Sequence, residues 1–127
     1  MIRIETDPFP SNAQLEALWL AAWGNRCGDY AGQILPRSLV HIGAFDGDRL
    51  IGFVNVAWDG GVHAFVLDTC VDPHFQRRGT ATQIVKRAAE VARERGAQWL
   101  HVDCEPQLEG FYRGCGFGPT SAGVMRL

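Results

Sequence analysis

The spacing of apolar residues near the N-terminus predicts a strand followed by a helix. Residues 2–4, Ile-Arg-Ile, alternate apolar and polar side chains, as a short strand with one buried face does. The stretch Ser11-Asn12-Ala13-Gln14 has the form of a capping box, in which the serine oxygen accepts from a free amide and the glutamine reaches back. Apolar residues then follow at helical spacing up to Gly24, which ends the predicted helix. Residues 25–36 show no clear period and predict a loop or a short second helix.

Three strands are predicted in the middle of the chain. Residues 39–45, 50–58 and 62–71 are rich in the β-branched and aromatic side chains that strands favour. Asp-Gly and Gly-Gly steps between them, at 46–48 and 59–61, are typical of tight hairpin turns. We therefore expect an antiparallel meander.

The apolar period changes from two to about 3.6 after this meander, which predicts a long helix over residues 79–95. Gly96 ends that helix, and residues 99–104 return to a strand pattern. A strand, a helix and a strand in succession imply parallel pairing of the two strands. The apolar positions of the helix are Ala81, Ile84, Val85, Ala88, Val91 and Ala92.

The rest of the chain predicts a short helix over residues 107–113 and a final strand within 121–127. No repeat, low-complexity segment or linker interrupts the sequence, so residues 1–127 are expected to form a single domain. The predicted fold class is α/β (α+β): a mixed central sheet flanked by helices, antiparallel in its N-terminal strands and parallel near the end.

Composition excludes several classes of protein. A chain of 127 residues that is 46% apolar can bury a substantial core. Twelve Lys and Arg against 14 Asp and Glu give a net charge of −2, which argues against a non-specific nucleic-acid binder. The four cysteines form no C-x-x-C pair, so neither a zinc knuckle nor a thioredoxin-type motif is expected. No export signal and no apolar run of about 20 residues is found, so we expect reduced thiols, a cytoplasmic location and no membrane association.

The segment from Val71 to Thr82 predicts an anion site. A strand ends there, a turn follows, and a helix begins with small residues, so that free amides and the helix dipole favour a bound phosphate. Gly79 and Ala81 let a ligand approach the backbone, and Arg77 and Arg78 add positive charge. The alternative is an ordinary strand-to-helix turn with two solvated arginines. The segment lacks the Gly-Lys-Ser/Thr of the Walker loop. It also lacks the three spaced glycines of the dinucleotide fingerprint.

Two motifs make the chain resemble the GNAT superfamily of acyl-CoA-dependent N-acetyltransferases over nearly its whole length. The first, Gln76-Arg77-Arg78-Gly79-Thr80-Ala81, matches the family's Q/R-x-x-G-x-G/A pyrophosphate turn, and a V-x-P precedes it at residues 71–73. The second, at residues 111–117, looks like the family's closing F-Y-x-x-x-G-F. The resemblance implies a splayed strand pair that holds acetyl-CoA as co-substrate, with no metal. The cofactor-binding residues it implies are Cys70, Val71, Gln76, Arg77, Arg78, Gly79, Thr80, Ala81 and Thr82.

Acyl transfer to an amine needs a base for the amine, whose pKa is about 10.4 in lysine, and an acid for the departing thiolate. Tyr112 matches the tyrosine of the closing motif and is the candidate acid; its alternative role is an aromatic core residue. Family members often carry a glutamate on the strand before the turn, whereas here Asp68 is the only carboxylate in that region. Asp68 is therefore the candidate base, acting directly or through water, with a structural hydrogen-bonding role as the alternative.

For several other residues we prefer a role that involves neither metal binding nor covalent catalysis. His101 and Asp103 share a strand face, but their spacing matches no metal signature, and Asp103 is expected to border the substrate cleft. Cys70 is expected to line the site rather than to carry the acyl group, and regular alternation would place it opposite His63.

The sequence thus predicts an enzyme that transfers an acetyl group from acetyl-CoA to a primary amine of a small molecule by direct attack. Acetylation of a protein or peptide amine is one alternative, and a non-catalytic acyl-CoA-binding regulator is another. A pure interaction module that binds no CoA would not need the phosphate turn. Residues 24–36 and the hairpin tips are expected to select the acceptor, and exposed strands would allow a homodimer.

Overall fold

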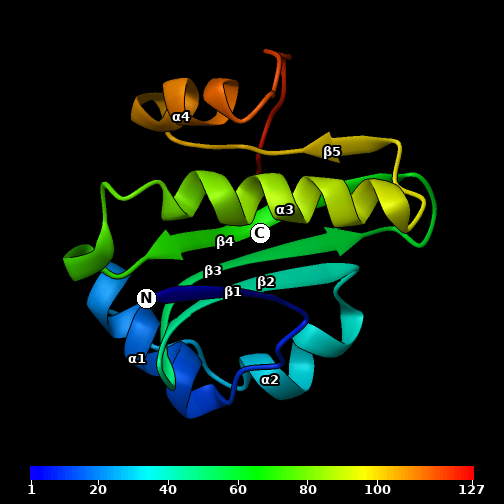
Figure 1. Ribbon diagram of the computed structural model, residues 1–127. Helices are drawn as coiled ribbons and strands as arrows, with labels where there is room; N and C mark the ends of the chain where they lie inside the picture. The colour runs from blue at the N-terminus through cyan, green and yellow to red at the C-terminus, as the bar shows by residue number, and fades with distance from the viewer.

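A computed structural model describes all 127 residues and contains one five-stranded mixed sheet. Its strands lie in the order of the sequence, and the first four pair antiparallel, whereas the last pair is parallel (Figure 1). This confirms the predicted meander and the parallel strand that follows the long helix. The strands are β1 (Ile2–Thr6), β2 (Val40–Asp46), β3 (Arg49–Trp58), β4 (His63–Val71) and β5 (Trp99–His101).

Helices cover both faces of the sheet. Figure 1 shows α1 and α2 on one side and α3 and α4 on the other. Short 3₁₀ turns at residues 35–37, 73–75 and 106–108 connect these elements. No helix is long and apolar enough to cross a membrane. The helices are α1 (Asn12–Trp23), α2 (Tyr30–Gln33), α3 (Thr80–Glu94) and α4 (Glu109–Gly114).

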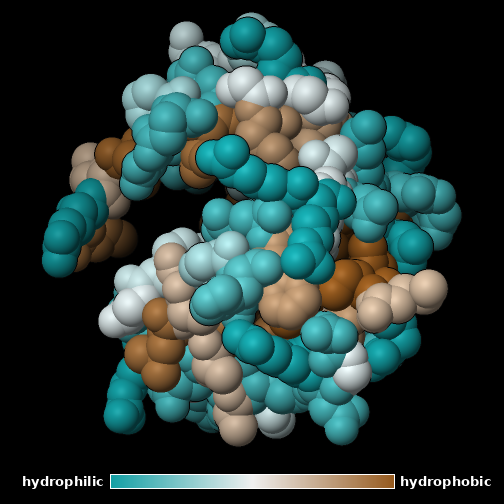
Figure 2. Space-filling model, turned by 60° about the vertical axis from the view of Figure 1, so that its left-hand side comes forward, coloured by the Kyte–Doolittle hydropathy of each residue, from teal (hydrophilic) through white to brown (hydrophobic).

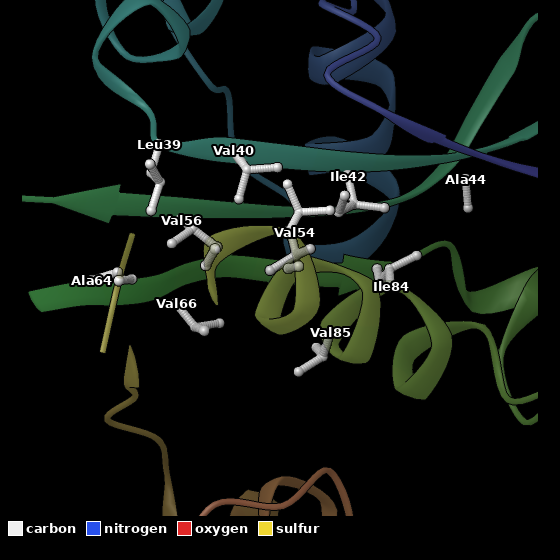
Figure 3. Packing of buried hydrophobic residues seen from close by; sticks show 14 of the residues in the cluster. Leu39, Val40, Ile42, Ala44, Val54, Val56, Ala64, Val66, Ile84 and Val85 are labelled. Carbon is white, nitrogen blue, oxygen red and sulfur yellow. The ribbon is translucent and has the colours of Figure 1, made fainter. Parts of the chain in front are cut away.

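The two helical layers bury separate cores. The face of α3 predicted from the sequence packs on the sheet through Ile84 and Val85, against Ile42, Val54 and Val66 (Figure 3). A second cluster on the opposite face joins α1 and α2 to β3 and β4; its members are Leu15, Leu18, Trp19, Tyr30, Leu35, Phe45, Leu50, Phe53 and Cys70.

The capping box and the C-terminal glycine of α1 are present as predicted. The Ser11 hydroxyl oxygen accepts from the Gln14 amide at 3.1 Å, and the Gln14 side chain accepts from the Ser11 amide at 3.0 Å. Gly24 ends the helix in the left-handed conformation, with φ of 75°. These local signals fix where α1 begins and ends, and α1 in turn positions the second core.

Two expectations about the C-terminal part are wrong. The strand predicted over 99–104 pairs only at Trp99–His101, because the chain then turns away from β4 toward α4 (Figure 1). The strand predicted within 121–127 does not form, and every side chain from Gly118 to Leu127 is exposed. Three paired residues of β5 offer too little edge to hold another strand, and Gly118, Pro119 and Gly123 disfavour one.

Candidate functional site

The site is built on an unpaired edge of β4. β5 pairs with β4 only over His63–Phe65, so the β4 backbone from Val66 to Val71 has no strand partner on that side. Free peptide groups along a strand edge can bind an extended ligand through backbone hydrogen bonds. The surface of the molecule is hollowed on one side, between a projecting arm and the body (Figure 2).

A bulge in β4 determines which side chains reach each face. Leu67 pairs with Asn55 and Cys70 with Phe53, so two residues three positions apart face the same side. Asp68 absorbs the irregularity with φ of 59°, in the left-handed region that non-glycine residues rarely adopt. The bulge therefore places Cys70 on the same face as His63, and the opposite placement expected from regular alternation is wrong.

Asp68 accepts a hydrogen bond from a residue within 25–36, the stretch in which the sequence shows no clear period. The Tyr30 hydroxyl donates to Asp68 Oδ2 at 2.7 Å. Tyr30 is 5% exposed, and its burial, followed by its contact with Asp68, raises the pKa of its phenol far above the usual value. It therefore remains a neutral donor. The Asp68 side chain itself is exposed to solvent. One of its oxygens is held by Tyr30, and the carboxylate lies on the face of the sheet that α1 and α2 cover.

The turn after β4 leaves four amides without partners. The first hydrogen bond of α3 runs from the Gln83 amide to the Gly79 carbonyl, and the amides from Gly79 to Thr82 donate to no group in the chain. Arg77 and Gly79 both adopt left-handed conformations, with φ of 64° and 78°. Such an arrangement of free N–H groups at a helix N-terminus is suited to bind an anion.

A pocket of about 210 Å³ opens at this turn. Seven of the nine cofactor-binding residues implied by the resemblance line it; Arg78 and Cys70 do not. The Arg78 guanidinium instead lies over the Phe75 ring, 5.2 Å from its centroid. The lining consists of Val71, Phe75, Gln76, Arg77, Gly79, Thr80, Ala81, Thr82 and Phe111.

A buried carboxylate clamps the start of the turn, and sequence reasoning missed it. Asp72 is 1% exposed, accepts from the His74 amide at 2.9 Å and from Arg49 Nη2 at 2.7 Å. Burial opposes its ionisation, yet the His74 contacts and the Arg49 guanidinium hold the pKa of Asp72 below its usual range. The sequence did contain a signal for this role, because an aspartate directly before a proline often caps a turn, and Asp72 precedes the proline that begins the 3₁₀ turn.

We expect Asp72→Asn to destabilise the fold by about 1 kcal/mol near neutral pH, since Arg49 is half exposed and its charge is screened. A lowered folded-state pKa stabilises the protein above the unfolded value of about 3.9, and this stabilisation is lost as the pH falls through the folded-state pKa. Urea unfolding at about pH 7 and about pH 3 should therefore show the two proteins converging in acid. Asp46→Asn, at an exposed carboxylate, is the control; an equal difference at both pH values contradicts the clamp.

The Cys70 side chain lies on the face of the sheet that α1 and α2 cover. Its side chain packs in the second core, and burial, followed by the Asp68 charge, raises the pKa of the thiol far above its usual value. A neutral buried thiol is a poor nucleophile. All four cysteines are free thiols. The thiol is therefore poorly suited to carry an acyl group, and the Cys70 side chain does not line the pocket at the turn.

Tyr112 lies on α4. It is 8% exposed and packs between the rings of Phe111 and Phe117, with centroid distances of 4.9 and 5.7 Å. Burial, opposed by the Thr69 hydroxyl and reinforced by Cys104, Cys115 and Asp103, raises the pKa of its phenol. Tyr112 and Asp103 also line a second pocket of about 310 Å³.

The histidines on the parallel strands do not form a metal cluster. His101 Nε2 lies 3.0 Å from His63 Nδ1, and its ring stacks on Phe65 at 4.9 Å between centroids. No group of three or more His, Cys, Asp or Glu side chains is arranged to hold a metal ion.

A mixed sheet whose parallel pair diverges beside free amides at a helix N-terminus, with a buried tyrosine on the last helix, is the arrangement that the resemblance to acetyltransferases implies. The sequence model of the acetyltransferase (GNAT) family matches residues 1–117, and the chain belongs to this family.

Curated relatives match part of the chain. A probable glucosamine 6-phosphate N-acetyltransferase from Oryza sativa subsp. japonica is 38% identical over 58 residues, which are 46% of this chain and 35% of that protein. A second glucosamine 6-phosphate N-acetyltransferase from the same species is 42% identical over 52 residues, 41% of this chain and 32% of that protein. The chain therefore matches about a third of the length of these relatives.

Solved structures match the whole chain. A GNAT family protein from Streptococcus pneumoniae has a TM-score of 0.82 and 28% identity, covering 100% of this chain and 98% of that one. A probable acetyltransferase from Staphylococcus aureus has a TM-score of 0.85 at 23% identity, with the same coverage. An aminoglycoside N-acetyltransferase solved with CoA has a TM-score of 0.79 at 18% identity, covering 100% of this chain and 94% of that one. At these identities, the last two show a shared fold.

Proposed function

We propose that this protein transfers an acetyl group from acetyl-CoA to a primary amine of a small molecule by direct attack. The observation that carries the proposal is the open edge of β4, which has free helix amides at its end, Asp68 on one face and Tyr112 opposite. A pyrophosphate would bind the amides of residues 79–82, and Gln76 and Arg77 would line its pocket. The pantetheine arm would lie along the unpaired edge that ends at Val71.

The proposed chemistry uses two groups on opposite faces of β4. Asp68 takes one proton from the protonated amine, directly or through one water, and the neutral nitrogen attacks the thioester carbonyl carbon. The nitrogen is cationic after the attack and loses its second proton to solvent. The carbon–sulfur bond then breaks, its electron pair stays on sulfur, and the Tyr112 hydroxyl gives its proton to the thiolate. Direct attack is favoured over an acyl-enzyme because the Cys70 thiol is neutral and buried in the second core.

The names of the similar proteins support a small-molecule acceptor. The curated relatives are named for glucosamine 6-phosphate, and one structural neighbour for aminoglycosides. Both names denote acceptors that carry amines on sugar rings. The exposed carboxylate of Asp68 suits such a cationic amine, whereas a protein amine would need a docking surface.

Calorimetric titration with acetyl-CoA, followed by an amine screen that detects the released thiol, tests this function. We expect 1:1 binding and thiol release with at least one aminosugar or alkylamine. A well-folded protein that does not bind acetyl-CoA would overturn the proposal. Binding without thiol release from any amine, including peptide amines, would favour the regulator.

Tyr30→Phe tests the role of Asp68 in this scheme. Because the hydroxyl donates to the carboxylate at 2.7 Å, we expect kcat/KM for the amine to fall roughly tenfold, the effect of one hydrogen bond to a charged group. Acetyl-CoA affinity should not change. In the Asp68→Asn background the same substitution should have little further effect, and full additivity of the two losses would contradict a shared role.

A further inference from the structure

The Thr69 hydroxyl is an exception among the buried polar groups of the chain. Its oxygen is the one buried side-chain nitrogen or oxygen atom without a hydrogen-bond partner. Leaving such a group unsatisfied usually costs stability, so an unpaired hydroxyl in a native fold points to a partner that forms in another state.

The β4 bulge aims this hydroxyl at the acid candidate. The flanking residues Asp68 and Cys70 face α1 and α2, where they contact Tyr30 and the second core. Thr69 lies between them and turns the other way, toward Tyr112 on α4. Its hydroxyl lies close enough to Tyr112 to lower the pKa of the phenol, but the two hydroxyls do not meet the distance and angle of an ordinary hydrogen bond.

We propose that Thr69 is a positioning residue whose hydroxyl donates to the phenolate that Tyr112 becomes after protonating the leaving thiolate. This inference rests on the proposed function. As the carbon–sulfur bond breaks, the phenol proton moves to sulfur and the negative charge moves to the Tyr112 oxygen. A neutral phenol gives the hydroxyl only a weak acceptor, whereas a phenolate is a strong one. The phenolate later regains a proton from solvent, and the amine proton leaves through Asp68.

The surroundings of Tyr112 otherwise disfavour a charged phenolate. The other groups facing its hydroxyl are Cys104 and Asp103, beyond β5, and Cys115, after α4. Each of them, like the burial of the ring, raises the pKa of the phenol. Thr69 is the one neighbour that lowers this pKa, and so the one that favours the charged form.

Thr69→Val is the test, with Thr69→Ser as the variant that keeps the hydroxyl. Removing an unsatisfied buried hydroxyl should raise the thermal unfolding temperature while lowering kcat roughly tenfold to a hundredfold, and serine should restore kcat. In the Tyr112→Phe background Thr69→Val should not change kcat. A loss of stability with Thr69→Val, or an undiminished effect without the Tyr112 hydroxyl, would show a structural role and overturn the proposal.

A second measurement does not depend on acetyl transfer. The chain has two tyrosines, so subtracting the tyrosinate absorbance of Tyr112→Phe isolates Tyr112, and circular dichroism confirms that the fold persists. We expect Thr69→Val to shift the titration of Tyr112 to higher pH and Thr69→Ser to leave it in place. An unchanged midpoint would overturn the coupling. A shifted midpoint in a protein that acetylates no amine would overturn the proposed function but leave the coupling of the two hydroxyls intact.

Discussion

Ala81→Asp should reduce acetyl-CoA affinity by at least about a hundredfold while the protein stays folded. Ala81 lies in the first turn of α3 and lines the pocket at the free amides. A carboxylate there would occupy the amides and repel the pyrophosphate, and juxtaposed like charges cost several kcal/mol. The first turn of α3 contains no acidic residue, so an aspartate there also interacts favourably with the helix dipole.

Gln83→Glu is the matched control for this experiment. It adds the same charge two positions later, at an exposed residue that does not line the pocket and whose amide already donates to Gly79. Calorimetry should show near-normal acetyl-CoA affinity for Gln83→Glu and none measurable for Ala81→Asp. Thermal unfolding should show both variants at least as stable as the parent. Equal losses in the two variants would mean that overall charge, rather than this turn, governs binding.

The parts of the fold that sequence predicted are those with strong local signals. The capping box at Ser11, the apolar face of α3 and the hairpin glycines each act within a few residues, and all appear in the structure. The turn before α3 was predictable for the same reason, because Gly79 takes the left-handed conformation that glycine favours, directly before the helix begins.

The features that sequence did not predict depend on long-range pairing. Nothing in Leu67-Asp68-Thr69 signals a bulge, since no glycine marks the left-handed residue. The bulge arises from the pairing of β3 with β4, and it reverses the face of Cys70. Tyr30 lies 38 residues from Asp68 in the sequence, on a helix of four residues without an apolar period. The candidate base could therefore be named from sequence, but the residue that holds it could not.

Tyr112→Phe should lower kcat by about 10²-fold, with little change in acetyl-CoA affinity, because removal of a general acid typically costs at least that much. The ring stays packed between Phe111 and Phe117, so the substitution removes the hydroxyl and little else. A regulator that binds acetyl-CoA without transferring it would show no change in function.

The leaving group provides the sharper test of the acid role. A selenol is more acidic than a thiol and departs without a proton, so acetyl-seleno-CoA should restore most of the activity of Tyr112→Phe. Asp68→Asn, which impairs the amine rather than the leaving group, should gain nothing beyond the effect seen in the parent protein. Steady-state kinetics with both donors would separate the two roles. If the seleno donor rescued neither variant, Tyr112 would be a packing residue, and protonation of the thiolate would fall to water that enters the open edge of β4.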